Sequence, residues 1–150
     1  MKTNFELVKE FHAAFNKTPD PEVPTEQSDK IRILRHRLIE EEFNEITQEL
    51  QMKSRTTLWD DFKYIDIKNH LIYDKGFDIN RLAKELSDLL YVVYGTAAAY
   101  GIPIDDVYRK VHENNMSKLQ SDGTVKYRED GKVLKPDTYV PLDVSKLLER

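Results

Sequence analysis

Apolar residues recur every three or four positions in four separate stretches of the chain, which is the spacing of one face of an α-helix. Polar caps, prolines and glycines bound these stretches where helices usually begin and end. The sequence therefore predicts four helices: residues 4–16 behind Thr3 or Asn4, a longer one from Thr25 or Ser28 to about Met52, a third from Asp78 or Asn80 to Gly101, and a fourth from Pro103 to about Leu119.

Two parts of the chain do not follow this period. Residues 53–77 carry aromatic and aliphatic side chains without a regular spacing, so short helices and a structured loop both remain open. Residues 120–150 contain two Asp-Gly pairs, each before a short β-prone run, which is compatible with a hairpin turning at Glu129–Gly131. We expect one all-α domain over residues 1–150, with a four-helix-bundle core over about 4–119 and an extended tail over about 120–150.

The composition excludes several classes of protein. A formal net charge of −4 argues against a basic face that grips nucleic acid. The chain has no cysteine, so it has no thiol nucleophile or cysteine-based zinc site, and this suits the cytoplasm. The longest apolar stretch, residues 89–102, is interrupted by Gly95 and Thr96 and is shorter than the roughly 20 residues of a membrane span. We therefore expect a cytoplasmic protein that binds neither nucleic acid nor a membrane.

Acidic residues take over the apolar stripe of the second predicted helix. The stripe that starts at Ile31 turns acidic at Glu42, Glu45 and Glu49, so the inward face becomes negative halfway along the helix. Glu41 adds a further carboxylate four residues before Glu45, and like charges at this spacing repel each other. This arrangement predicts a cationic partner.

The third predicted helix carries a matching pair, Glu85 and Asp88, beside its apolar stripe. Burying such carboxylates without compensation would cost several kcal/mol each, whereas divalent cations would bridge them. The alternative is a solvated acidic face in which Arg81 and Lys84 neutralise this pair, but a surface explanation must then hold for both helices. Because the donors are all oxygens, Mg²⁺ or Mn²⁺ is favoured over zinc or copper.

The fourth predicted helix also exchanges apolar for polar residues, where Asn115 and Lys118 continue its stripe. Lysine binds phosphate oxygens and asparagine can bind phosphate, sugar or base, although a snorkelling lysine and a helix-end asparagine are equally ordinary. His12, on the first apolar stripe, is more typical of a hydrogen-bonded core residue than of a catalytic one. Trp59 fits a base-stacking role or a packed loop equally well. Carboxylates, a metal and a lysine together indicate a polyphosphate substrate.

Glu41-Glu42-x-x-Glu45 followed by Glu85-x-x-Asp88 resembles the EExxE…ExxD signature of MazG-like all-α NTP pyrophosphohydrolases. The strings VHENNMSKL and SDGTVKYREDGKVLKP resemble the branch related to phosphoribosyl-ATP pyrophosphohydrolase. Outside residues 53–80 the similarity covers most of the chain. The resemblance implies a MazG-like fold for the predicted helical core.

The resemblance also implies a role for each candidate residue: Mg²⁺ ligation by Glu42, Glu45, Glu85 and Asp88, with Mn²⁺ as a substitute, activation of water by Glu41, and phosphate or sugar binding by Asn115 and Lys118. The implied reaction cleaves a nucleoside triphosphate such as dUTP or dCTP between its α and β phosphates, in a homodimer or homotetramer. Two alternatives stay open, namely hydrolysis of phosphoribosyl-ATP and a non-catalytic helical dimer that binds nucleotide or protein. The long connection around residues 53–80 leaves the preferred base open.

Overall fold

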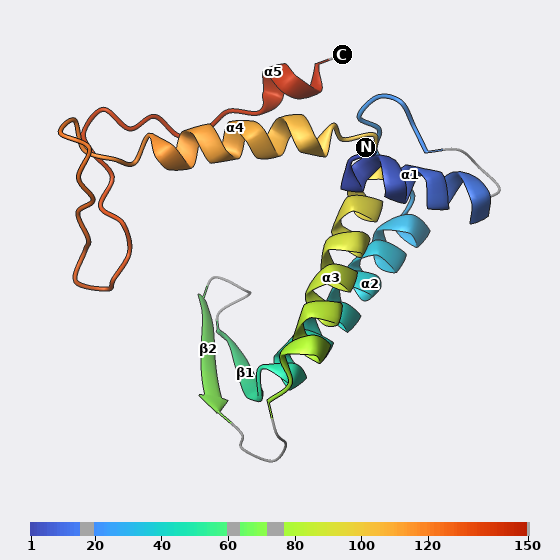
Figure 1. Cartoon of the computed structure of the whole chain (residues 1–150), viewed down its shortest axis with the longest axis horizontal. Helices are drawn as coiled ribbons and strands as arrows, with labels where there is room; N and C mark the ends of the chain where they lie inside the picture. Colours follow the sequence, from blue (N-terminus) through green and yellow to red (C-terminus); the bar gives the residue numbers. More distant parts are fainter. Residues whose placement is uncertain (16–19, 60–63, 72–76, 150) are drawn as a thin grey trace. The chain divides into compact units, whose positions relative to one another are not determined.

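A computed structural model of the chain describes residues 1–15, 20–59, 64–71 and 77–149, with side chains described outside residues 53–76 (Figure 1). The elements, in chain order, are α1 (Asn4–Phe15), α2 (Asp29–Glu49), β1 (Met52–Trp59), β2 (Tyr64–Leu71), α3 (Ile79–Ala99), α4 (Ile104–Met116) and α5 (Ser145–Leu148). The chain forms two compact units. A terminal unit comprises residues 1–26 and 97–150, and a central unit comprises residues 27–96.

All four predicted helices form, and the all-α class is confirmed. The first begins with a capping box, in which the backbone N–H of Glu6 donates to Thr3 Oγ1 (3.2 Å) and the N–H of Thr3 donates to the Glu6 carboxylate (2.7 Å). Ser28 caps α2, and Asp78 accepts the Asn80 N–H at the start of α3 (2.8 Å). Within the described residues, each helix is too short or too polar to cross a bilayer.

Between α2 and α3 the chain forms two antiparallel strands, so short helices and a loop were both wrong for residues 53–59 and 64–71. The rest of this predicted segment, residues 60–63 and 72–76, lies outside the described residues. The strands β1 and β2 pair in register from Met52 opposite Leu71 to Trp59 opposite Tyr64. Helix α2 ends at Glu49, before the predicted Met52, and Gln51 follows with a φ of 55° as the chain turns into β1. The β-prone residues of this segment were visible in the sequence, but without the regular alternation that identifies a strand. The side chain of Trp59 lies outside the described part, so the choice between base stacking and a packed loop stays open.

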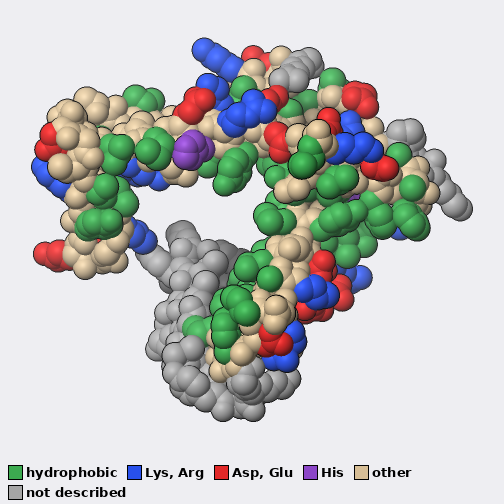
Figure 2. All heavy atoms as spheres, in the orientation of Figure 1, with side chains coloured by type: hydrophobic (Ala, Val, Ile, Leu, Met, Phe, Trp, Pro, Cys, Tyr) green, Lys and Arg blue, Asp and Glu red, His purple; other side chains and the backbone are tan. Residues whose placement is uncertain are grey.

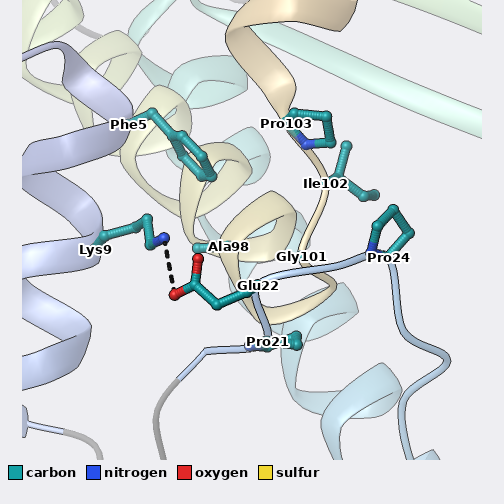
Figure 3. Close-up of a pocket in the computed structure, with 9 residues that line it drawn as sticks. All are labelled: Phe5, Lys9, Pro21, Glu22, Pro24, Ala98, Gly101, Ile102 and Pro103. Atoms are coloured by element: carbon teal, nitrogen blue, oxygen red, sulfur yellow. Dashed lines mark ion pairs between the residues drawn. The ribbon is translucent and has the colours of Figure 1, made fainter. Parts of the chain in front are cut away.

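The C-terminal end of α3 and the loop after α1 are joined in the terminal unit. Helix α3 ends in a Schellman-type turn, in which Ile102 N–H donates to Ala97 O (2.9 Å) and Gly101 has a φ of +66°. The N–H of Thr25 donates to Tyr100 O at 2.9 Å. A small cavity of about 170 Å³ lies next to this junction (Figure 3) and is lined by Phe5, Lys9, Pro21, Glu22, Pro24, Ala98, Gly101, Ile102 and Pro103.

His12 is a core residue of the terminal unit. Its Nδ1 lies 2.7 Å from Asp20 Oδ2, and the two side chains are 7% and 8% exposed. Val8, one turn earlier on α1, is fully buried. The structural interpretation of His12, a hydrogen-bonded side chain on an apolar stripe, therefore agrees with the observed contact.

The tail is held to α4 through Asn114. Its side chain donates to Val140 O and accepts from the Tyr139 hydroxyl, both at 2.8 Å. The predicted turn at Glu129–Gly131 is present, with Gly131 N–H donating to Arg128 O. Pairing beside it is limited to one isolated bridge, Tyr127 to Val133, so no strand pair forms in this part of the tail.

Candidate metal and active site

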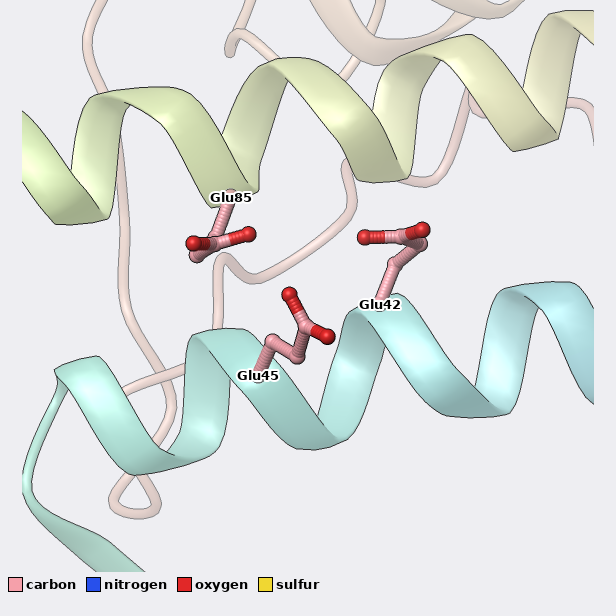
Figure 4. A group of neighbouring side chains, drawn as sticks. All are labelled: Glu42, Glu45 and Glu85. Carbon is pink, nitrogen blue, oxygen red and sulfur yellow. The ribbon is translucent and has the colours of Figure 1, made fainter.

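Helices α2 and α3 lie side by side in the central unit and run in opposite directions (Figures 1 and 4). Near the end of α2, Glu49 accepts a hydrogen bond from Arg81 Nε, near the start of α3, at 2.8 Å. Ile46, one helical turn earlier, is 7% exposed. The acidic half of α2 therefore faces the acidic first half of α3.

Three predicted ligands meet at this interface. One carboxylate oxygen from each of Glu42, Glu45 and Glu85 lies within 4.8 Å of the other two. Figure 4 shows the two α2 side chains reaching toward α3 and that of Glu85 reaching toward α2. Glu85 is buried, while the other two are partly buried. The acidic residues that helical spacing placed on the facing sides of α2 and α3 thus form a cluster of three carboxyl groups.

Crowding changes the acidity of this cluster. A hydrogen bond shared with the carboxyl group of Glu85, followed by repulsion from the charge of Glu85, raises the pKa of Glu45. Burial, followed by the charges of Asp88 and Glu41, raises the pKa of Glu42. Both shifts disfavour the ionised form, so a cation that binds here would relieve an existing electrostatic cost.

Asp88, the fourth predicted ligand, is not one of the three clustered carboxylates. Its Oδ2 lies 2.8 Å from Lys84 Nζ, and the same ammonium group lies 3.0 Å from Glu85 Oε2. These carboxylates raise the pKa of Lys84, Asp88 most strongly. The surface alternative drawn from the sequence is therefore partly present, since Lys84 pairs with Glu85 and Asp88. Arg81 instead contacts Glu49 and Asp78.

The three remaining candidate residues are not members of this carboxylate cluster. Glu41 is exposed on α2, directly before Glu42. Asn115 and Lys118 belong to the terminal unit, where Lys118 Nζ donates to Asn115 Oδ1 at 2.6 Å. The roles of these three residues therefore stay predictions.

Lys84 contacts two predicted metal ligands, whereas the sequence indicates only a surface partner for the acidic pair. It directly precedes Glu85 and lies four residues before Asp88. The spacing of four residues places Lys84 and Asp88 on the same face of a helix, and this was the available signal.

The chemistry of the donors fits a hard divalent cation. All are carboxylate oxygens, which Mg²⁺ and Mn²⁺ prefer, and no cysteine exists to favour a softer metal. The spacing of 4.8 Å or less lets one ion contact more than one carboxylate after small side-chain movements. The residues present therefore fit the metal that the sequence predicted.

The helical fold and the carboxylate cluster agree with the class that the family comparison shows, that of the MazG-like all-α nucleotide pyrophosphohydrolases. A family model described as phosphoribosyl-ATP pyrophosphohydrolase matches residues 8–115, more than half of the chain. The chain belongs to this family. No curated protein matches it. The protein is thus a hydrolase that acts on a phosphoric anhydride bond of a nucleotide.

Proposed function

We propose that the protein hydrolyses a nucleoside triphosphate between its α and β phosphates, with Mg²⁺ as cofactor, to a nucleoside monophosphate and pyrophosphate. The observation that carries the proposal is the cluster of Glu42, Glu45 and Glu85, which lies within the part of the chain that the family match covers. A pyrimidine deoxynucleotide, dUTP or dCTP, is the first substrate to test, from the resemblance of the sequence.

In this proposal Glu42, Glu45, Glu85 and Asp88 hold the cation. When bound, a divalent cation polarises phosphoryl oxygens and neutralises charge on the leaving pyrophosphate. Glu41, exposed beside these residues, orients the attacking water and accepts its proton as the water oxygen bonds to the α-phosphorus. The bond from that phosphorus to the bridging oxygen breaks, and pyrophosphate leaves.

Asn115 and Lys118 are proposed to bind the nucleotide. Lysine offers a point charge to phosphate oxygens, and the asparagine amide can donate to phosphate or sugar. Their side chains already contact each other at 2.6 Å, so one anionic group could engage both.

A second candidate is phosphoribosyl-ATP, because the description of the matching family names this substrate. It is cleaved at the same type of bond, between the α and β phosphates, so the carboxylate cluster alone does not separate the two candidates. The bulky phosphoribosyl group on the base is the chemical difference that an assay can use.

We expect monophosphate and pyrophosphate in equal amounts when the purified protein is incubated with its substrate and Mg²⁺, and no product in EDTA. The panel contains the ribo- and deoxynucleoside triphosphates and phosphoribosyl-ATP, with products separated by chromatography and pyrophosphate assayed. Exclusive turnover of phosphoribosyl-ATP would select the second candidate. Diphosphate with orthophosphate would contradict α–β cleavage, and no product from any compound would favour a non-catalytic binding protein.

We also propose that the protein is a homodimer or homotetramer. A groove of about 460 Å³ on the central unit supports this, since it is mostly apolar and lined by His36, Ile39, Glu40, Phe43, Leu89 and Val93. Phe43 is 54% exposed and Leu90, on α3, is 53% exposed. Figure 2 shows hydrophobic side chains at the surface of this unit. Exposed apolar surface of this kind is typical of a contact between subunits.

The expected molar mass in solution is therefore a multiple of 17.7 kDa, measured by light scattering after size exclusion. Phe43→Asp should shift the protein toward the monomer, because a carboxylate cannot be buried in an apolar contact without cost. Tyr108→Asp, at a position of α4 that is 71% exposed, is the matched control. A wild-type monomer at all concentrations would contradict the proposal.

A further inference from the structure

Lys84 neutralises two of the proposed metal ligands at once. Its Nζ lies 3.2 and 3.0 Å from the two carboxylate oxygens of Glu85 and 2.8 Å from Asp88 Oδ2. The lysine side chain is 64% exposed, whereas that of Glu85 is 11% exposed. A solvent-exposed ammonium group therefore contacts a buried carboxylate.

The same oxygens cannot serve an ammonium group and a divalent cation equally well. A positive charge about 3 Å from the ligand oxygens would repel a metal ion that binds them, and each hydrogen bond to Lys84 occupies an oxygen lone pair. Metal binding therefore requires Lys84 to move, and its long, exposed stem lets it do so without a change in the backbone.

The second cation of α3 differs in this respect. Arg81 pairs with Glu49 at 2.8 Å and with Asp78, neither of which is a proposed ligand. Of these two basic residues of α3, Lys84 is therefore the one whose ion pairs occupy the oxygens that a metal ion would bind.

We propose that Lys84 is an internal counter-ion that competes with the metal for Glu85 and Asp88, and so sets the affinity of the site for divalent cations. The inference rests on the proposed function, because it takes these two residues as ligands. Lys84 is neither a ligand nor a catalytic residue in this account. It stabilises the carboxylates until a divalent cation displaces its ammonium group, and it thereby raises the metal concentration that the protein needs.

The test measures Mn²⁺ binding to the full chain, without nucleotide, by calorimetry and by the loss of free Mn²⁺ signal in electron paramagnetic resonance. Lys84→Met keeps a side chain of similar length without the charge and should bind Mn²⁺ between about three- and thirty-fold more tightly, the effect of removing two partly exposed ion pairs. Lys84→Arg retains the charge and should remain close to wild type. Lys110→Met is the matched control, because it breaks a lysine–glutamate pair of 2.7 Å on α4.

Thermal unfolding supplies an independent readout. In EDTA, Lys84→Met should melt below wild type, because Glu85 and Asp88 lose their counter-ion, and saturating Mn²⁺ should raise its Tm by more than that of wild type. Unchanged or weaker Mn²⁺ binding in Lys84→Met would overturn the inference while leaving the metal site intact. Equally tight binding in Lys84→Arg and Lys84→Met would also overturn it, because the charge would then not be the cause. A wild-type protein and a Lys84→Met variant that both fail to bind Mn²⁺ would instead reject the proposed metal site itself.

Discussion

Glu45→Gln is expected to lower turnover by at least about 100-fold while the helices remain folded. Loss of a residue that merely supports a metal ligand typically costs 10- to 100-fold in affinity or activity, and a direct ligand should cost no less. The amide keeps the size of the side chain but removes the charge that a divalent cation needs. Asp88→Asn should have the same effect. Steady-state rates with saturating Mg²⁺, together with circular dichroism, measure both parts of the prediction.

The stability of Glu45→Gln should move in the opposite direction to its activity. The folded protein raises the pKa of Glu45 above its ordinary value of 4.5, so this group favours folding below that pH and loses its contribution as the pH rises through the folded pKa. At neutral pH and in EDTA, Glu45→Gln should therefore melt at or above the wild-type temperature. A substitution that lowers activity while it keeps or raises Tm is typical of a residue that serves function and not folding.

Asp29→Asn is the matched control. It removes a carboxylate from the same helix, but one that is 88% exposed and lies 3.1 Å from Arg32 Nη1 instead of in the cluster. Its rate should stay within about twofold of wild type, as is usual for surface substitutions. Near-wild-type rates in both Glu45→Gln and Asp88→Asn would contradict the metal assignment.

The second large effect is expected from Gly101→Ala, which should lower Tm by roughly 5–10 °C. Gly101 has a φ of +66°, a conformation that costs other L-residues about 1–2 kcal/mol. An added Cβ would also lie 2.2 Å from Val23 O, so the loop after α1 would have to move away from the end of α3. The hydrogen bond from Thr25 N–H to Tyr100 O holds this loop in place and would be strained. Differential scanning calorimetry measures the change.

Gly123→Ala separates the two contributions. Gly123 has a similar φ of +78°, but a Cβ there would meet nothing within 4 Å. Its substitution should therefore show the backbone cost alone and lower Tm by less than half as much. Equal losses in the two variants would show that contact with Val23 contributes nothing.

Local signals in the sequence were sufficient for the helices. The Thr3–Glu6 capping box, the Ser28 cap and the positive φ at Gly101 act within a few residues, so the sequence could predict where α1, α2 and α3 begin or end. Local signals were not sufficient for β1 and β2. Strand pairing joins residues such as Met52 and Leu71, which are far apart in the sequence and are not related by a local period.

The candidate site divides in a similar way. Helical spacing by itself predicted that Glu42, Glu45 and Glu49 share the inward face of one helix and that Glu85 and Asp88 share that of another. Only the packing of α2 against α3 decided that Glu42, Glu45 and Glu85 meet. The same packing decided that Asp88 contacts Lys84 and that Glu49 contacts Arg81. Side-chain partners on two helices depend on the distance and rotation between the helix axes, and these follow from tertiary packing and not from the period of either helix.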